Sequence, residues 1–143
     1  MTKARFDRHS SLVTLGLPAL LGVGIAVSLG VRAADDKGWY TAEQATRGHP
    51  AYNSYCAQCH GPQLTGAMGP PLVGDAFLNK WTHKPLIELF NYEQSKMPPT
   101  NPGSVPEDKM WLITAYILQK NGFPAGSTPL NAQTAARPLV KSP

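Results

Sequence analysis

The chain has 143 residues and a formal net charge of +4, a length that suits one folded domain. The charge is uneven, because residues 1–33 carry four basic and one acidic side chain, whereas residues 34–143 carry nine and eight. The basic character therefore belongs mainly to the N-terminal segment, and it gives no argument for nucleic acid or for an acidic partner.

Residues 1–33 have the layout of an export signal. A basic segment ending near His9 precedes an uncharged run over residues 10–31, and Val31-Arg32-Ala33 resembles a cleavage site. The run is also about as long as a bilayer is thick, so either a cleaved signal peptide or a retained N-terminal membrane anchor is expected. Both alternatives send residues 34–143 across the membrane, because the positive charge precedes the run.

The first helix of the exported part is expected over residues 42–58. Thr41 and Gln44 can form a capping box, in which each side chain bonds the backbone amide of the other residue. Pro50 lies inside this range and should bend the helix or divide it in two. Gly48 costs helix stability, which suggests that another helix approaches closely there.

Two further helices are expected nearer the C-terminus. Pro85 suits the first turn of a short helix over residues 85–94. Ser104-Val105-Pro106-Glu107 is a second possible capping box and predicts a last helix over residues 105–120, which stops at Asn121-Gly122.

The segments between and after these helices favour irregular structure, and no strand is convincing. Residues 61–74 are rich in Gly and Pro, which predicts a loop whose apolar side chains cover something apolar. From Phe123 onward the sequence has no periodicity, so an extended tail lying on the domain is expected. The fold class is therefore all-α.

Cys56-Ala57-Gln58-Cys59-His60 reads Cys-x-x-Cys-His, the attachment pattern of a c-type haem. On a helix, the two cysteines share a face and His60 lies beside them. Two thiols on one face can add across the two vinyl groups of a haem, and the imidazole can then ligate the iron. One covalent haem c on Cys56 and Cys59 is the prediction.

Three other interpretations compete for the two cysteines. An exported protein could join them in a disulfide. A thioredoxin-like redox pair would require a βαβ context, which the flanking sequence lacks. A zinc site would require further ligands at suitable spacing, but no other cysteine exists and His49 and His83 are isolated.

The iron would need a sixth ligand opposite His60, for which histidine and methionine are the usual candidates. Met97 is preferred because it follows a helix and precedes Pro98 and Pro99, which stiffen the backbone around it. Met110 is expected to fill the core, and Met68 is expected to lie on the same side of the haem as His60. His83 is the main alternative to Met97. On the other face, the Pro70 carbonyl is a candidate acceptor for the His60 Nδ1 proton.

Residues 40–126 carry a series of motifs in a characteristic order. They are Tyr40-Thr41-x-x-Gln44-Ala45, Gly48, Tyr52, Cys56-x-x-Cys59-His60-Gly61, Leu64-x-Gly66, Gly69-Pro70-x-Leu72-x-Gly74, Phe77, Trp81, Met97-Pro98 and Ala115-Tyr116-Ile117-Leu118-x-x-Asn121-Gly122. In these motifs the chain resembles the small monohaem class I cytochromes c of bacterial periplasms. The resemblance implies that fold, with three to four helices around one haem.

The resemblance also implies roles for individual residues. It implies thioethers at Cys56 and Cys59, axial ligands His60 and Met97, and a hydrogen bond from His60 to Pro70. Leu72 and Trp81 are expected to contact the haem as well. The first helix should cross the last, with Gly48 and Tyr52 against Leu112 and Tyr116. Residues 34–143 would form the cytochrome domain, with a core over 40–126 and a tail over 127–143.

The expected function is electron transfer in the periplasm, with iron cycling between Fe(II) and Fe(III). The protein would be a monomer that takes electrons from a dehydrogenase and passes them to a terminal oxidase or another cytochrome. One alternative is a membrane-anchored subunit of a dehydrogenase or oxidase complex, and another is a haem sensor or peroxidase with an open sixth site. No triad, paired acid/base site or nucleotide loop indicates another enzyme.

Overall fold

The computed structural model describes residues 37–141. The expected signal peptide or anchor over residues 1–33 lies outside the described residues. Within residues 37–141, the structure contains no helix with the length and apolar character needed to cross a membrane.

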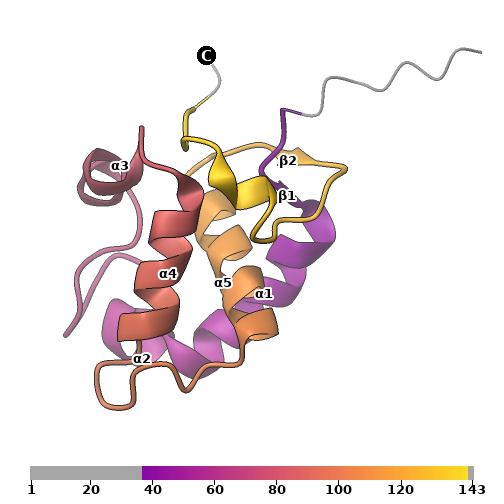
Figure 1. The fold of residues 1–143 in the computed structure, drawn as a ribbon. Coiled ribbons are helices and arrows are strands. Elements are labelled where there is room, and N and C mark those ends of the chain that lie inside the picture. The colour runs from indigo at the N-terminus through magenta and orange to yellow at the C-terminus, as the bar shows by residue number, and fades with distance from the viewer. Residues whose placement is uncertain (1–36, 142–143) are drawn as a thin grey trace, which may run out of the picture. The chain divides into compact units, whose positions relative to one another are not determined.

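The described chain is mostly helical, which confirms the predicted all-α class (Figure 1). A short strand and two helices come first, and three further helices follow, separated by loops. A C-terminal segment ends the described chain. The elements in order are β1 (Tyr40–Thr41), α1 (Ala42–Tyr55), α2 (Ala57–His60), α3 (Asp75–Trp81), α4 (Leu86–Lys96), α5 (Glu107–Lys120), β2 (Ala125–Gly126) and the 3₁₀ turn η1 (Thr134–Ala136).

Helices α1 and α5 cross in direct backbone contact at Gly48. A Cβ atom at this position would lie 2.0 Å from the Leu112 carbonyl oxygen and 2.8 Å from the Tyr116 Cβ. Next to the crossing, the Tyr52 and Tyr116 rings lie 5.5 Å apart between centroids. The expected crossing is therefore confirmed, and glycine is required there because any side chain would force the helices apart.

Pro50 was expected to bend the first helix or to divide it in two, and the helix is not divided there. Helix α1 runs through Pro50 to Tyr55, and the interruption falls at Cys56, which has φ −124° and ψ −32°. Proline removes one backbone donor, but the buried contacts of Gly48 and Tyr52 hold the helix against α5 on both sides of it. Helix α2 then forms a separate turn that carries Cys59 and His60.

The last helix starts later than expected, and the second capping box is wrong. Pro106 is the residue before α5, and no side chain caps that end. A residue that precedes proline is driven toward extended backbone, so Val105 cannot begin a helix. The expected helix over residues 85–94 is present as Leu86–Lys96.

Helix α3 was missed by the sequence analysis. Its seven residues run from Asp75 to Trp81, and its two buried aromatic side chains, Phe77 and Trp81, stand four apart. This i, i+4 aromatic pair was the available signal. It is weak because the helix is short and follows a Gly- and Pro-rich loop.

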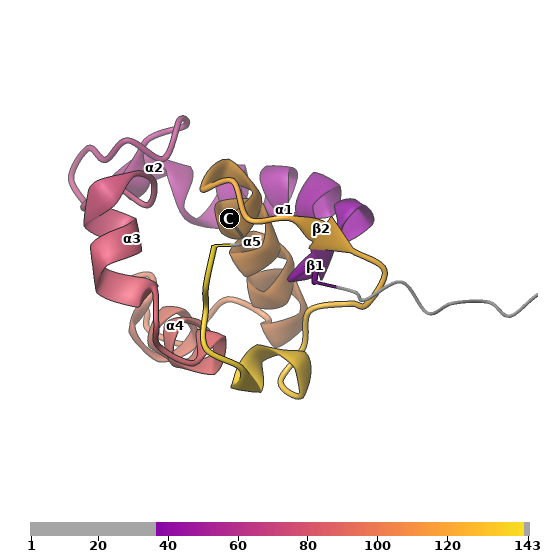
Figure 2. The ribbon, with the colours of Figure 1, turned by 90° about the horizontal axis from the view of Figure 1, so that it is seen from above.

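The C-terminal tail lies on the domain and is anchored at several points. Its strand β2 pairs in parallel with β1 over two residues in each strand. The expectation that the chain contains no strand is therefore wrong. Leu130 and Leu139 are buried, and the Gln44 amide bonds both the Leu130 N–H at 2.7 Å and the Leu130 carbonyl at 2.9 Å. In Figures 1 and 2 the tail passes beside α4, which η1 contacts.

Candidate haem site

One cavity of about 200 Å³ opens between α2, the loop that follows it, and helices α3, α4 and α5. Most of its walls are apolar side chains, among them Phe77, Leu89 and Ile113. All seven residues predicted to contact a haem line this cavity, namely Cys56, Cys59, His60, Pro70, Leu72, Trp81 and Met97. Residues up to 41 positions apart in the sequence thus meet at one site.

Both cysteines are half-buried free thiols. No disulfide joins Cys56 to Cys59, and within residues 37–141 no group of three or more His, Cys, Asp or Glu side chains could hold a metal ion. The disulfide and zinc interpretations therefore find no support in this part of the chain. Burial, the nearby Glu93 and the neighbouring Cys59 raise the pKa of the Cys56 thiol to about 12.

His60 is held in one orientation by two contacts from the loop after α2. Its Nδ1 lies 2.8 Å from the Pro70 carbonyl oxygen. Because a carbonyl only accepts, Nδ1 must carry the proton, and Nε2 is left to bind a metal. Gly69 lies against the ring, since a Cβ there would be 2.9 Å from the His60 Cε1.

The loop over residues 61–74 is fastened to the Cys-x-x-Cys-His turn by backbone hydrogen bonds. The Gly66 N–H donates to the His60 carbonyl at 2.9 Å, and the Gly69 N–H donates to the Cys59 carbonyl at 2.8 Å. The Tyr52 hydroxyl donates to the Gly61 carbonyl at 2.6 Å. This wall of the cavity is therefore built as one unit with the haem-attachment motif.

Asn121 fastens the far end of the same loop. Its buried side chain donates to the Leu72 carbonyl at 2.9 Å and accepts from the Gly74 N–H at 3.1 Å. From the sequence, Asn121 was expected only to end the last helix. Its second role was missed because no local pattern links residue 121 to residues 72–74.

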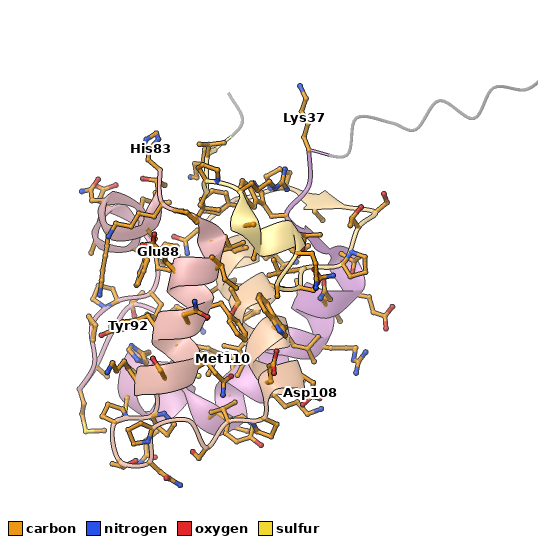
Figure 3. All side chains as sticks on the ribbon, in the orientation of Figure 1. Lys37, His83, Glu88, Tyr92, Asp108 and Met110 are labelled. Atoms are coloured by element: carbon orange, nitrogen blue, oxygen red, sulfur yellow. The ribbon has the colours of Figure 1, made fainter. Side chains whose placement is uncertain are left out.

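Of the five residues considered as the sixth ligand, only two line the cavity. Met97, at the end of α4, and Met110, in α5, both line it. Met68 is 76% exposed, and His49 stacks on Tyr116 at 5.0 Å. His83 is exposed and projects away from the helices in Figure 3. None of these last three lines the cavity.

The rim of the cavity is aromatic and basic. Trp81 of α3 and Tyr92 of α4 have ring centroids 5.5 Å apart, and Figure 3 shows Tyr92 on the side of α4 that faces α3. The Lys80 Nζ lies over both rings, 4.9 Å and 4.4 Å from their centroids. These cation–π contacts hold Trp81 at the cavity wall.

Glu93 was not predicted as a site residue, yet it lines the cavity and is only 7% exposed. Its Oε2 accepts from the Thr114 hydroxyl at 2.5 Å. Burial raises the pKa of its carboxyl to about 8, and the Thr114 hydrogen bond opposes that rise. The available signal was its position on the apolar stripe of α4, next to Leu89 and Phe90.

The residue set fits a haem c. Two free thiols and an imidazole with only Nε2 available stand on one wall, a methionine stands at another, and the remaining surface is largely apolar. Thiols are the groups that c-type haems attach to, and thioether and imidazole are their usual axial ligands.

A protein-family model described as cytochrome c oxidase, cbb3-type, subunit III matches residues 43–117, which is more than half of the chain. The match contains both cysteines, His60 and Met97, and it ends within α5. It does not reach Asn121, β2 or the tail. No curated protein and no solved structure matches the chain.

Proposed function

The chain belongs to the family described as cytochrome c oxidase, cbb3-type, subunit III, and we propose that it is a periplasmic electron carrier. It is a haem-based electron-transfer cytochrome, with haem c held covalently by Cys56 and Cys59. The haem supplies the one-electron Fe(II)/Fe(III) couple. The observation that carries the proposal is that His60 and Met97 line one cavity together with the two cysteines.

In this proposal His60 and Met97 would both bind the haem iron. The Pro70 carbonyl supports His60, because its hydrogen bond to Nδ1 fixes the ring and leaves Nε2 for the iron. Met97 caps the end of α4 with extended backbone, whereas Met110 is 2% exposed within the core. With both residues bound to the iron, small ligands would have no free site, which favours a carrier over a sensor or peroxidase.

Partners of this carrier are proposed to dock weakly through an apolar surface near the haem. Residues 34–143 carry nine basic and eight acidic side chains, so no strong field would steer a charged partner. Met68, exposed on the loop that forms one wall of the cavity, offers an apolar contact of the kind used in transient complexes. A dehydrogenase would be the donor and a respiratory component the acceptor.

A second candidate is a membrane-anchored cytochrome subunit of an oxidase or dehydrogenase complex. The family description names an oxidase subunit, which favours this candidate, and a retained N-terminal segment over residues 10–31 would supply the anchor. Mass spectrometry of the protein expressed in a bacterium with haem-attachment machinery distinguishes the two. A mature chain starting at Ala34 or Asp35 supports the free carrier, and an intact N-terminus supports the anchored subunit.

Absorption spectra of the haem-loaded protein test the carrier itself. We expect a low-spin spectrum in both oxidation states, a methionine–ferric charge-transfer band, and no response to carbon monoxide. Met97→Ala should abolish the band and admit carbon monoxide, whereas Met110→Leu, a change in the same cavity, should preserve both properties. A high-spin ferric spectrum, or carbon monoxide binding by the wild type, would replace the carrier with a sensing or catalytic function.

A further inference from the structure

The carboxyl group of Glu93 stands out among the residues around the haem cavity. It is the only carboxyl group among the described residues that line the cavity. Its Oε1 is buried and has no hydrogen-bond partner within the described chain. An unpaired buried oxygen is costly for the fold, so a purely structural role gives no reason for it.

The second carboxyl oxygen is anchored, which determines where the first one stands. The Thr114 hydroxyl of α5 donates to Glu93 Oε2 at 2.5 Å and also lies 2.9 Å from the Met110 carbonyl. This contact ties the carboxyl of α4 to α5 across the cavity wall. The carboxyl is therefore held in place beside an otherwise largely apolar cavity that Glu93 lines, and its Oε1 is not free to turn toward solvent.

We propose that Glu93 is a positioning residue for electron transfer, which lowers the reduction potential of the haem by placing an unpaired oxygen beside it. An acceptor oxygen carries negative charge density, so it stabilises Fe(III), with its larger positive charge, over Fe(II). The low dielectric of the cavity strengthens this effect. The inference rests on the proposed function, because it requires a haem in this cavity.

The test is the midpoint potential of haem-loaded variants, measured by spectroelectrochemistry. Glu93→Leu removes the oxygen and should raise the potential, whereas Glu93→Gln retains an acceptor and the Thr114 contact and should stay closer to the wild type. Glu88→Leu is the matched control, since Glu88 is an exposed glutamate on the same helix (Figure 3) and does not line the cavity. Its potential should stay near the wild-type value.

A structural role would give a different result. In that case Glu93→Leu would lower the thermal unfolding temperature while leaving the midpoint potential at the value of Glu88→Leu, and this outcome overturns the proposal. If Glu93→Leu does not fold, Glu93→Ala removes the same oxygen with less steric demand and is read in the same way. A different observation would contradict the proposed function itself. In that case the wild-type protein would lack covalent haem, or its spectrum would lack the methionine–ferric band.

Discussion

The α1–α5 crossing and the haem cavity differ in how tightly they are packed, although helix α5 takes part in both. At the crossing, Gly48 leaves no room for even one methyl group against Leu112. In the cavity, side chains from α2, α3, α4 and α5 and from the loop after α2 surround about 200 Å³. The crossing is complete from protein contacts alone, whereas the cavity gains its contacts from the haem that Cys56 and Cys59 attach.

The polar groups follow the same division. Beside the crossing, the Tyr52 hydroxyl donates to the Gly61 carbonyl. In the cavity, Glu93 has an unpaired oxygen, and burial helps to raise the pKa of Cys56. The buried hydroxyl beside the crossing is thus paired, whereas the cavity is lined by a residue with an unpaired buried oxygen.

Removing both attachment points should have the largest effect. Cys56→Ser combined with Cys59→Ser should abolish covalent haem, measured as loss of haem staining on a denaturing gel. Because the cavity walls then lose their apolar partner, the thermal unfolding transition followed by circular dichroism should broaden or disappear. Cys56→Ser alone is the control and should retain haem through one thioether. Retained staining in the double variant would contradict the assignment.

Gly48→Ala tests the region that needs no cofactor. Its Cβ would meet the backbone of Leu112 at 2.0 Å, and overpacking of this kind costs about 3 kcal/mol or more when backbone must move. Denaturant unfolding of the haem-loaded protein measures the loss. Arg47→Ala, at an exposed neighbouring position, should cost under about 0.5 kcal/mol. Equal stabilities of the two variants would show that the helices do not meet at Gly48.

Leu139→Ala asks whether the tail, which lies outside the family match, belongs to the protein-packed region. Leu139 is fully buried, and its amide donates to the Lys84 carbonyl at 2.8 Å. Truncating a buried leucine costs about 2–5 kcal/mol, measured by the same denaturant unfolding. Val140→Ala changes the exposed neighbour and should cost little. A negligible loss in Leu139→Ala would mean that the tail does not pack on the domain in solution.

Gly69→Ala should have the smallest effect on stability, about 1 kcal/mol, but a clear effect on the site. The added Cβ would lie 2.9 Å from the His60 ring, so the imidazole must shift relative to the Pro70 carbonyl. We expect a displaced methionine–ferric band and a changed midpoint potential. Ala67→Gly, in the same loop, should preserve both. An unchanged spectrum in Gly69→Ala would show that the loop does not orient His60.

Several features could be predicted from the sequence because their signals are local. The Cys-x-x-Cys-His turn and the Thr41–Gln44 capping box each involve neighbours within a few residues. The Gly- and Pro-rich loop and the end of α5 at Asn121 also follow from residues close together in the sequence. The role of Met97 as an axial ligand stays a prediction, although its place in the cavity agrees with it.

Other features depend on contacts between distant parts of the chain, and only the tertiary structure decides them. Pro50 does not divide α1 because α5 holds the helix on both sides. Asn121 reaches back to Leu72, and Gln44 reaches forward to Leu130. The burial of Glu93 depends on α5, because its position on the apolar stripe of α4 does not determine which side chain of another helix it contacts.

By itself, the sequence determined the haem-attachment chemistry and the helical class, because both follow from short-range patterns. The partners of each buried polar group depended on the fold, because closing long stretches of chain brings together residues that no local pattern connects.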